Sequence, residues 1–348
     1  MENGKLNRKG VNYDVGTHTR GPQTPSSRDS FDPVTARREM EIIANDLHCN
    51  AVRISGQDIS RLVTAAQYAL EQGLEVWFSP ALVDADEQET LQYFAECAKA
   101  AEALRAQSPQ VIFVAGCEHT FFMKGLVDGE TAFERIQTFM KPWRLLKSTI
   151  RRGSFNKRLN AFLARAANVV REHFHGPLTY ASGPWENVNW EPFDMVAIDY
   201  YRDARNQQSY REKLKKYLDI GKPVVITEFG CCTYRGAEDK GAYGWAIVDR
   251  NETPPLLKGE YVRDESVQAH YLVETLDILT SEKVDGVFWF TFIMPSYPFH
   301  ESARFDLDTA SFGLVKPLKD RNGATYKDMP WEPKQSFAAL ADYYSNHA

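Results

Sequence analysis

Eight short apolar runs recur along the chain, and amphipathic stretches separate them. The runs are rich in β-branched and aromatic residues, and each is almost continuously hydrophobic rather than alternating. This pattern is typical of strands that are buried on both faces of a parallel sheet. The predicted strands cover residues 10–15, 50–55, 74–80, 111–118, 178–182, 195–200, 223–229 and 286–292.

Helical spacing of apolar residues marks the segments between these strands. In residues 35–47, for example, Met40, Ile43 and Leu47 fall on one face of a helix. Gly73 follows another such segment, as glycine commonly does at helix ends. Besides 35–47, helices are predicted over residues 58–72, 87–106, 159–174, 209–218, 266–279 and 331–345.

The alternation of strands and helices predicts the α/β class and a closed (β/α)8 TIM barrel, formed as a single catalytic domain over residues 1–348. An open doubly wound sheet is the alternative. Residues 11–17 read Val-Asn-Tyr-Asp-Val-Gly-Thr and lack the glycine-rich fingerprint of dinucleotide-binding sheets, which disfavours that alternative. Long loops are predicted after strands 4, 7 and 8, at residues 119–156, 231–261 and 294–328, where they would wall a cleft.

Composition limits the classes of partner. The formal net charge is −6, so no nucleic acid is expected, because such binding needs a basic excess. No run of about 18 apolar residues predicts a membrane span, and no membrane partner is expected. The polar beginning of the sequence favours a cytoplasmic location. Composition leaves the oligomeric state open. Residues 151–158 form a basic stretch, predicted as a solvated helix start, with a phosphate or partner site as the alternative.

The five cysteines lack the spacing of a disulfide framework. Their number is odd, and no CxxC or Cys/His metal pattern occurs among Cys49, Cys97, Cys117, Cys231 and Cys232. We therefore predict reduced thiols, no metal and no cofactor. A disulfide between the two adjacent cysteines is the alternative.

Two carboxylates stand at the carboxyl ends of wholly apolar runs. Glu118 ends the fourth predicted strand, and Glu228 ends the seventh. A barrel places its chemistry at these strand ends, and strands 4 and 7 face each other across the mouth. Glycoside hydrolysis needs one carboxylic acid and one carboxylate on the same bond. The alternative for each glutamate is an ion pair with an arginine that holds loops together. The pair favours catalysis.

These residues resemble the (β/α)8 glycoside hydrolase clan with its acid/base on strand 4 and its nucleophile on strand 7. Residues 226–230, Ile-Thr-Glu-Phe-Gly, are similar to the nucleophile strand of the clan. The resemblance implies that Glu228 is the nucleophile and Glu118 the acid/base of a retaining reaction on the O-glycosidic bond of a β-glycoside. It further implies an arginine beside the nucleophile, a tyrosine near it and a tryptophan under the sugar. The matching positions are Arg53, Tyr200 or Tyr201, and Trp289.

The resemblance also implies a geometry. Carboxyl groups about 5–5.5 Å apart give retention of configuration, and about 6.5–9.5 Å gives inversion. We predict retention. One residue departs from the pattern of the clan: Cys117 stands where most members have the asparagine that holds the sugar 2-hydroxyl. Some β-mannanase-type families also lack this asparagine, so the departure leaves the activity in place and the sugar open.

Other residues at the strand ends have two readings each. His119 could bind a sugar hydroxyl or hold its loop, and Trp185 could stack on a sugar or pack its loop. Asp199 could hydrogen-bond in the cleft or support the strand-2 arginine. Tyr13 and Asp14 end the first strand and could close the floor of the site.

Three loop carboxylates, Glu186, Glu191 and Glu301, are predicted as surface charge. The expected ligand is a small-molecule or oligosaccharide glycoside. Two rival functions remain: a catalytically idle barrel that binds a glycan or a protein, and a repurposed barrel enzyme that acts on a specialised metabolite.

Overall fold

A computed structural model describes residues 5–18 and 25–347 of the chain. Eight parallel strands close a barrel in the order β1-β10-β7-β6-β5-β4-β3-β2, with helices between them. The fold is therefore the predicted TIM barrel. The strands of the barrel are β1 (Arg8–Asp14), β2 (Ala51–Gly56), β3 (Glu75–Pro80), β4 (Val111–Cys117), β5 (Leu178–Ser182), β6 (Val196–Asp199), β7 (Val224–Phe229) and β10 (Gly286–Trp289).

The helices follow the predicted apolar spacing closely. Helix α3, for example, begins with a capping box in which the Asp86 and Glu89 side chains each bind the other residue's backbone N–H. The α-helices are α1 (Pro33–Asn45), α2 (Ile59–Glu71), α3 (Glu87–Arg105), α4 (His119–Phe122), α5 (Ala132–Met140), α6 (Pro142–Arg152), α7 (Phe155–Arg171), α8 (Tyr210–Leu218), α9 (Glu265–Ser281) and α10 (Gln335–Asn346).

The chain divides into two compact units. The first unit contains Met1–Tyr13, Arg37–Val52 and Tyr200–Ala348, and the second contains Asp14–Ala36 and Arg53–Asp199. The assignment of all 348 residues to one catalytic domain stays a prediction. Across the part of the chain that the structure describes, no helix is long and apolar enough to cross a membrane.

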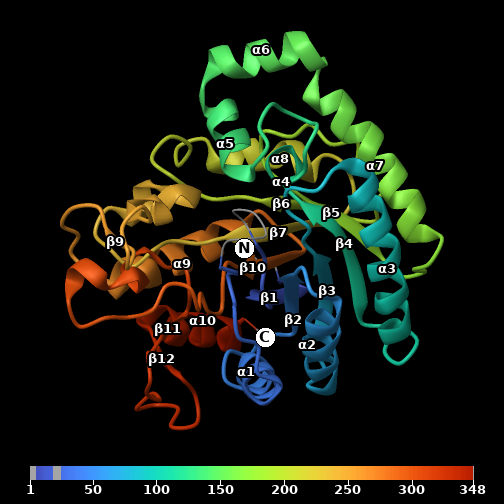
Figure 1. Cartoon of the computed structure of the whole chain (residues 1–348). Helices are drawn as coiled ribbons and strands as arrows, with labels where there is room; N and C mark the ends of the chain where they lie inside the picture. Colours follow the sequence, from blue (N-terminus) through green and yellow to red (C-terminus); the bar gives the residue numbers. More distant parts are fainter. Residues whose placement is uncertain (1–4, 19–24, 348) are drawn as a thin grey trace. The chain divides into compact units, whose positions relative to one another are not determined.

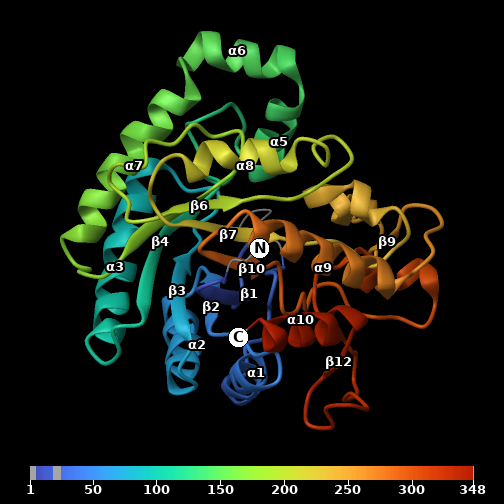
Figure 2. The same cartoon turned by 180° about the vertical axis from the view of Figure 1, so that it is seen from behind.

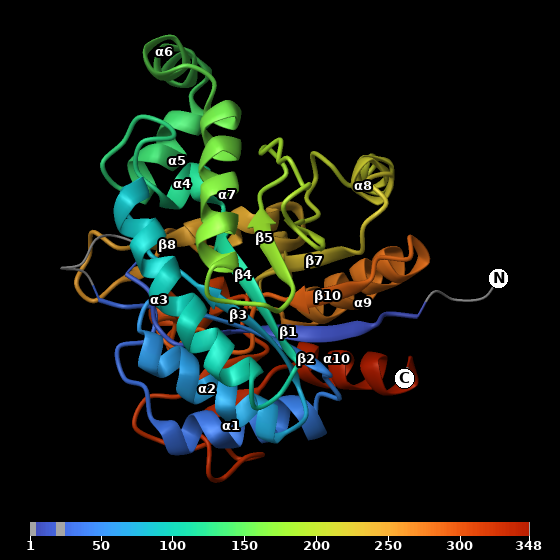
Figure 3. The same cartoon turned by 90° about the vertical axis from the view of Figure 1, so that its right-hand side faces the viewer.

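The second unit holds strands β3 to β6, and Figure 3 shows α3 and α7 side by side along them. The segment after β4 differs from the long loop predicted at residues 119–156, because it folds into α4, α5 and α6. Thr131 caps α5 through its side chain, and Pro142 opens α6 at a position that needs no N–H. In Figures 1 and 3, α6 lies at the end of α7 that points away from β4 and β5.

The first unit packs α9 against α10, and the two lie side by side in Figure 2. The predicted loops after the seventh and eighth strands contain short elements rather than open coil. These are β8 (Val248–Asp249), β9 (Leu256–Leu257) and β11 (Val315–Pro317), with the 3-10 turns η1 (Ala237–Asp239), η2 (Gly241–Ile247), η3 (Ala303–Phe305) and η4 (Leu307–Ala310). The helix predicted from residue 331 begins only at Gln335, because Trp331–Pro333 form the strand β12, which pairs with β11.

The last barrel strand is shorter than predicted. It ends at Trp289, and beyond it Phe292 donates its N–H to the carbonyl of Asn12 at 2.9 Å, while the Thr291 hydroxyl donates to the same carbonyl at 2.7 Å. The Asn12 side chain in turn donates to the Thr227 carbonyl at 2.9 Å. Asn12 thus fixes the strand ends of the first unit around Glu228, a role that the sequence pattern did not reveal.

Candidate active site

Glu228 lies at the carboxyl end of β7, directly after four fully buried residues. Its own side chain is only partly buried. The Tyr201 hydroxyl donates a hydrogen bond of 3.0 Å to Glu228 Oε2, and the Glu228 carbonyl accepts the N–H of Tyr200 at 2.7 Å. The first unit therefore holds this carboxylate by a phenol and by its own backbone.

The two tyrosines after β6 have different environments. Tyr201 reaches Glu228, whereas the Tyr200 hydroxyl donates to the carbonyl of Tyr210 in α8 at 2.9 Å. The Tyr210 hydroxyl returns a bond of 2.8 Å to the Tyr200 carbonyl, and the two rings are 4.4 Å apart. Of the two positions left open by the sequence, Tyr201 therefore contacts the candidate nucleophile and Tyr200 anchors α8.

Trp289 does not present a ring to solvent. It is 0% exposed, and its Nε1 donates to the Phe312 carbonyl at 3.0 Å. A ring without exposed surface has no face to offer a sugar, so the expected sugar floor does not lie on Trp289. The next residue, Phe290, is partly exposed and contacts the Phe312 ring at 5.8 Å.

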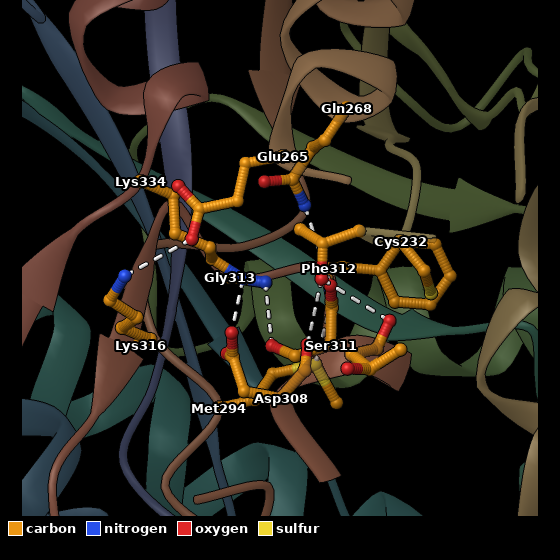
Figure 4. A network of polar contacts seen from close by, with 12 residues as sticks. Cys232, Glu265, Gln268, Met294, Asp308, Ser311, Phe312, Gly313, Lys316 and Lys334 are labelled. Atoms are coloured by element: carbon orange, nitrogen blue, oxygen red, sulfur yellow. Dashed lines mark hydrogen bonds and ion pairs between the residues drawn. The ribbon is translucent and has the colours of Figure 1, made fainter. Parts of the chain in front are cut away.

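Phe312 links these aromatic residues, because its ring also contacts Tyr201 at 5.9 Å. A buried polar network holds the loop that carries it (Figure 4). Gln268 donates to the Cys231 carbonyl at 2.6 Å and accepts a bond of 2.6 Å from the Ser336 hydroxyl. Lys334 is fully buried and pairs with Asp308 at 3.1 Å. The loop is thus fixed from α9 and from the start of α10.

In the second unit, Glu118 follows β4 and has a left-handed backbone, with φ 41° and ψ 50°. A side chain other than glycine adopts this conformation at a cost of about 1 kcal/mol or more. Its N–H donates to the Ala181 carbonyl at 2.9 Å, and its carbonyl accepts the Phe121 N–H at 2.8 Å. Backbone strain of this kind concentrates at functional sites.

A bulge in β4 directly precedes the left-handed turn at Glu118. The register with β5 shifts between Val114 and Cys117, and Gly116 there has φ +82°. A Cβ atom on Gly116 would lie 2.2 Å from His119 Nε2, so only glycine fits. Bulges of this type redirect the side chains that follow, and here Glu118 follows.

His119 is a structural residue in this fold. Its ring is buried, stacks on Tyr180 at 5.4 Å and 5°, and its Nε2 lies 3.0 Å from the Ala115 carbonyl. Burial lowers the pKa of this imidazole to about 4, although the contact with Ala115 acts in the opposite direction. Of its two readings, the one that holds the loop is the one that the geometry supports.

Glu186 was predicted as surface charge, and this prediction is wrong. Its side chain is buried and accepts bonds from the Thr120 N–H at 3.0 Å, the Thr120 hydroxyl at 2.5 Å, the Tyr180 hydroxyl at 2.7 Å and the Gly183 N–H at 3.2 Å. Burial raises the pKa of its carboxyl, and these donors oppose the rise. Its donors lie up to 66 positions away, so local sequence gave no signal.

Arg53, Asp199 and Cys117 form a polar group in the second unit. Arg53 is 2% exposed, its Nε donates to Ser79 Oγ at 3.2 Å, and its guanidinium lies 3.9 Å from Asp199 Oδ1. Cys117 Sγ donates to the other oxygen of Asp199 at 3.2 Å. Asp199 thus connects the arginine to the thiol that stands in the place of the usual asparagine.

No family model and no curated protein sequence matches the chain, but solved structures do. A GH113 β-1,4-mannanase is similar over 99% of each chain, with a TM-score of 0.61 and 14% sequence identity. The GH113 β-mannanase from Alicyclobacillus acidocaldarius covers 100% of this chain and 99% of its own, with a TM-score of 0.59 and 14% identity. Thermotoga maritima Cel5A, solved with a mannotriose substrate, covers 87% and 97%, with a TM-score of 0.51 and 12% identity.

The chain has the fold of the (β/α)8 glycoside hydrolases. At these identities the similarity concerns the fold alone, and it spans nearly the whole chain. The expected resemblance to this clan is therefore confirmed at the level of structure. The individual residues have to be judged on their own geometry.

Trp185 packs its loop in this glycosidase-type barrel. Its ring stacks on Phe121 of α4 at 4.5 Å and lies 5.9 Å from the ring of Phe139 in α5. Its side chain remains partly exposed, and its buried Nε1 has no hydrogen-bond partner among the residues that the structure describes. Trp185 thus packs its loop, and the exposed part of its side chain leaves room for a ligand contact.

The end of the first strand is less accessible than expected. Tyr13 is fully buried, and its hydroxyl donates to Glu39, which also accepts a bond of 2.9 Å from Trp331 Nε1. Asp14 accepts the Gly16 N–H at 3.0 Å, and burial raises the pKa of its carboxyl. Tyr13 therefore belongs to the core of the first unit, and only Asp14 is partly exposed.

Cys231 and Cys232 have free thiols, as predicted. Cys231 Sγ donates to the Cys232 carbonyl, and Cys232 Sγ donates to the Ala310 carbonyl, both at 3.3 Å. Burial raises the pKa of each thiol. The vicinal disulfide considered from the sequence is therefore absent between these two described residues.

Proposed function

We propose that this protein is a retaining glycoside hydrolase, with Glu228 as nucleophile and Glu118 as acid/base. The observation that carries the proposal is the bond of 3.0 Å from the Tyr201 hydroxyl to Glu228 Oε2, at the end of β7. A phenol in this place orients the carboxylate for attack on the anomeric carbon. Glu118, at the end of β4, is partly exposed and fixed by a left-handed turn.

The first half-reaction breaks the glycosidic bond. The Glu118 carboxyl gives its proton to the glycosidic oxygen, which leaves as an alcohol. A Glu228 carboxylate oxygen attacks the anomeric carbon from the opposite side and forms a glycosyl ester. Arg53 supports negative charge in the site from its buried position beside Asp199.

The second half-reaction releases the sugar. Glu118, now ionised, takes a proton from water, and the hydroxide oxygen attacks the anomeric carbon. The bond to Glu228 breaks, its carboxylate is restored, and Glu118 is again protonated. Two inversions give overall retention of configuration.

The substrate class that we propose is a β-glycoside, with β-mannosides as the first candidates. Two of the structural relatives are named β-mannanases, and a third was solved with mannotriose. Cys117 stands where an asparagine would bind the 2-hydroxyl, and its thiol contacts Asp199. In this proposal, the partly exposed Cys117, held by the buried Asp199, replaces that contact.

A panel of aryl β-glycosides tests the proposal, with β-mannosides and β-glucosides first. The matched variants are Glu118→Gln and Glu228→Gln, which keep the shape of each side chain. We expect turnover by the wild type and a loss of at least about a thousandfold in each variant. In Glu228→Ala, azide should restore turnover and yield a glycosyl azide of inverted configuration.

Full activity in Glu228→Gln would overturn the assignment of the nucleophile. Turnover with inversion in the wild type would overturn the two-step reaction. If no glycoside is hydrolysed while oligosaccharides still bind, the alternative of a catalytically idle glycan-binding barrel replaces this proposal.

A further inference from the structure

Helix α6 presents its apolar side to the solvent. Trp143, Leu146 and Ile150 follow helical spacing on one face and are 63%, 61% and 79% exposed. Ser148, on the other side of the helix, is 1% exposed. A surface helix of a globular protein normally shows the reverse arrangement, with its apolar stripe toward the core.

Polar contacts fix this orientation. The Ser148 hydroxyl accepts the N–H of Asp128 at 3.0 Å, and the Asp128 carboxylate pairs with Arg151 and Arg152 at the end of the helix. The polar side is therefore tied to the preceding loop. Rotation of α6 to bury its apolar face would break these contacts, so we regard the outward orientation as a property of the fold.

The preceding helix is held in the same manner. Arg135 of α5 is fully buried, and it donates to the Phe121 carbonyl at 2.6 Å and to the Gly129 carbonyl at 3.0 Å. Two apolar side chains of α5, Phe133 and Met140, are 50% and 60% exposed. Polar anchoring with exposed apolar side chains thus extends over both helices.

The charge around α6 is strongly positive. Residues 141–158 contain seven Lys or Arg residues and no Asp or Glu, although the whole chain has a net charge of −6. Lys141, Arg144 and Lys147 have no carboxylate partner among the described residues, and the Arg144 guanidinium lies 5.2 Å from the Trp143 ring centre. An apolar stripe with Trp beside free cationic side chains is typical of helices that lie in a lipid interface.

We infer that the outer face of α6, made by Trp143, Leu146 and Ile150 with its flanking basic residues, docks on an anionic lipid surface. The helix would lie parallel to that surface, with the three apolar side chains among the acyl chains and the basic side chains on lipid phosphates. That no helix among residues 5–18 and 25–347 could cross a membrane has no bearing on such a contact, because a surface helix does not cross the bilayer.

A second copy of the chain fits this face less well. The three exposed side chains offer roughly 400 Å² of apolar surface, about the apolar part of what each partner of a stable protein pair buries, so charge rather than area decides between the two occupants. A twofold dimer would place one basic segment against its own copy, and like charges repel. A lipid bilayer needs no matching shape and supplies the opposite charge.

Vesicle flotation tests the inference with the full chain. The probes are vesicles of phosphatidylcholine alone and vesicles in which about a third of the lipid is phosphatidylglycerol. We expect flotation with the anionic vesicles only, with partitioning weakened about tenfold or more in the triple variant Trp143→Ser, Leu146→Ser, Ile150→Ser. The triple variant Lys141→Gln, Arg144→Gln, Lys147→Gln should weaken it to a similar extent, and so should raised salt.

The control replaces exposed apolar side chains elsewhere. Val34 and Val262 are 77% and 58% exposed, and Val34→Ser with Val262→Ser should float as the wild type does. Apart from the half-buried Arg144, all variants alter exposed positions, so their melting curves should match. No flotation of the wild type, or equal flotation of the α6 variants, would overturn the inference. A change from dimer to monomer in the apolar variant, seen by sedimentation without any lipid binding, would assign the face to a second copy instead.

Discussion

The Tyr201 hydroxyl donates to Glu228 Oε2 at 3.0 Å, whereas the neighbouring Tyr200 hydroxyl donates to the Tyr210 carbonyl at 2.9 Å. Two consecutive tyrosines after β6 thus have different partners: one contacts the candidate nucleophile and the other contacts α8. Each loses one hydroxyl on replacement by phenylalanine. The pair therefore offers a matched comparison between a site residue and a structural residue.

Tyr201→Phe should lower kcat on an aryl glycoside by on the order of tenfold to a hundredfold, because the carboxylate loses the donor that orients it. The ring remains, so the fold and its melting temperature should be nearly unchanged. Tyr200→Phe should keep kcat and lower the free energy of unfolding by about 1–3 kcal/mol, since the buried Tyr210 carbonyl loses its donor.

Steady-state kinetics and urea unfolding of both variants check this contrast. An equal loss of kcat in both variants, or a loss only in Tyr200→Phe, would contradict the assignment of Tyr201 to the nucleophile.

Cys117 should be the cysteine that a thiol reagent reaches first. It is partly exposed, whereas Cys49, Cys97, Cys231 and Cys232 are buried. Burial also raises the pKa of these four thiols, to about 12 for Cys97. We therefore expect iodoacetamide to modify one cysteine rapidly in the native protein, and peptide mass spectrometry should locate it at Cys117.

Modification of Cys117 should also abolish the proposed glycosidase activity, because the added group would lie beside Asp199 and one position from Glu118. Cys117→Ser is the control, and it should retain activity and resist the reagent. Complete modification with full activity would show that substrate does not approach this thiol.

The pattern of the sequence predicted the strands well because a buried parallel strand needs a continuous apolar run. The same pattern located Glu118 and Glu228, since each is the first charged residue at the end of such a run. The strand boundaries differ from prediction by one or two residues in most cases, and by three at the end of β10.

The parts that escaped prediction depend on partners far away in the chain. Glu186 is buried because Thr120, 66 positions away, and Tyr180, 6 positions away, supply its donors, and no periodic pattern of the sequence marks either partner. The pattern also could not tell Tyr200 from Tyr201, because adjacent aromatic residues look alike until α8 takes one of them. The segment of α6 was predicted as part of a long loop, yet it forms a helix whose apolar face Asp128 and Ser148 hold outward.

Lys334→Met should destabilise the first unit strongly. The ammonium group and the Asp308 carboxylate are both fully buried and 3.1 Å apart, so removal of one leaves the other without its buried partner. Such a loss typically costs about 3–5 kcal/mol. Arg263, which lies 2.7 Å from Asp308, should keep the effect near the lower end of this range.

Lys316→Met is the matched control, because Lys316 pairs with Glu265 at 3.1 Å but both side chains are partly exposed. Its effect should stay below about 1 kcal/mol. Urea unfolding of the two variants gives both values. Equal effects would mean that burial of Lys334 does not govern the stability of this loop.

The buried imidazole of His119 should make stability depend on pH. Burial lowers its pKa to about 4 in the folded state, against an ordinary value of 6.5. Between these values the unfolded chain binds more protons than the folded one, so the free energy of unfolding rises with pH. The contribution of the neutral imidazole to this free energy is lost as the pH falls from 6.5 toward 4. The loss attributable to this group is on the order of 3 kcal/mol.

In His119→Gln this pH-dependent contribution should disappear, so that the difference in free energy of unfolding between the wild type and the variant narrows as the pH falls from 7 to 4. Urea unfolding at several pH values measures the gap, with His270→Gln at an exposed histidine as the control. A gap that stays constant across this range would contradict a neutral, buried His119.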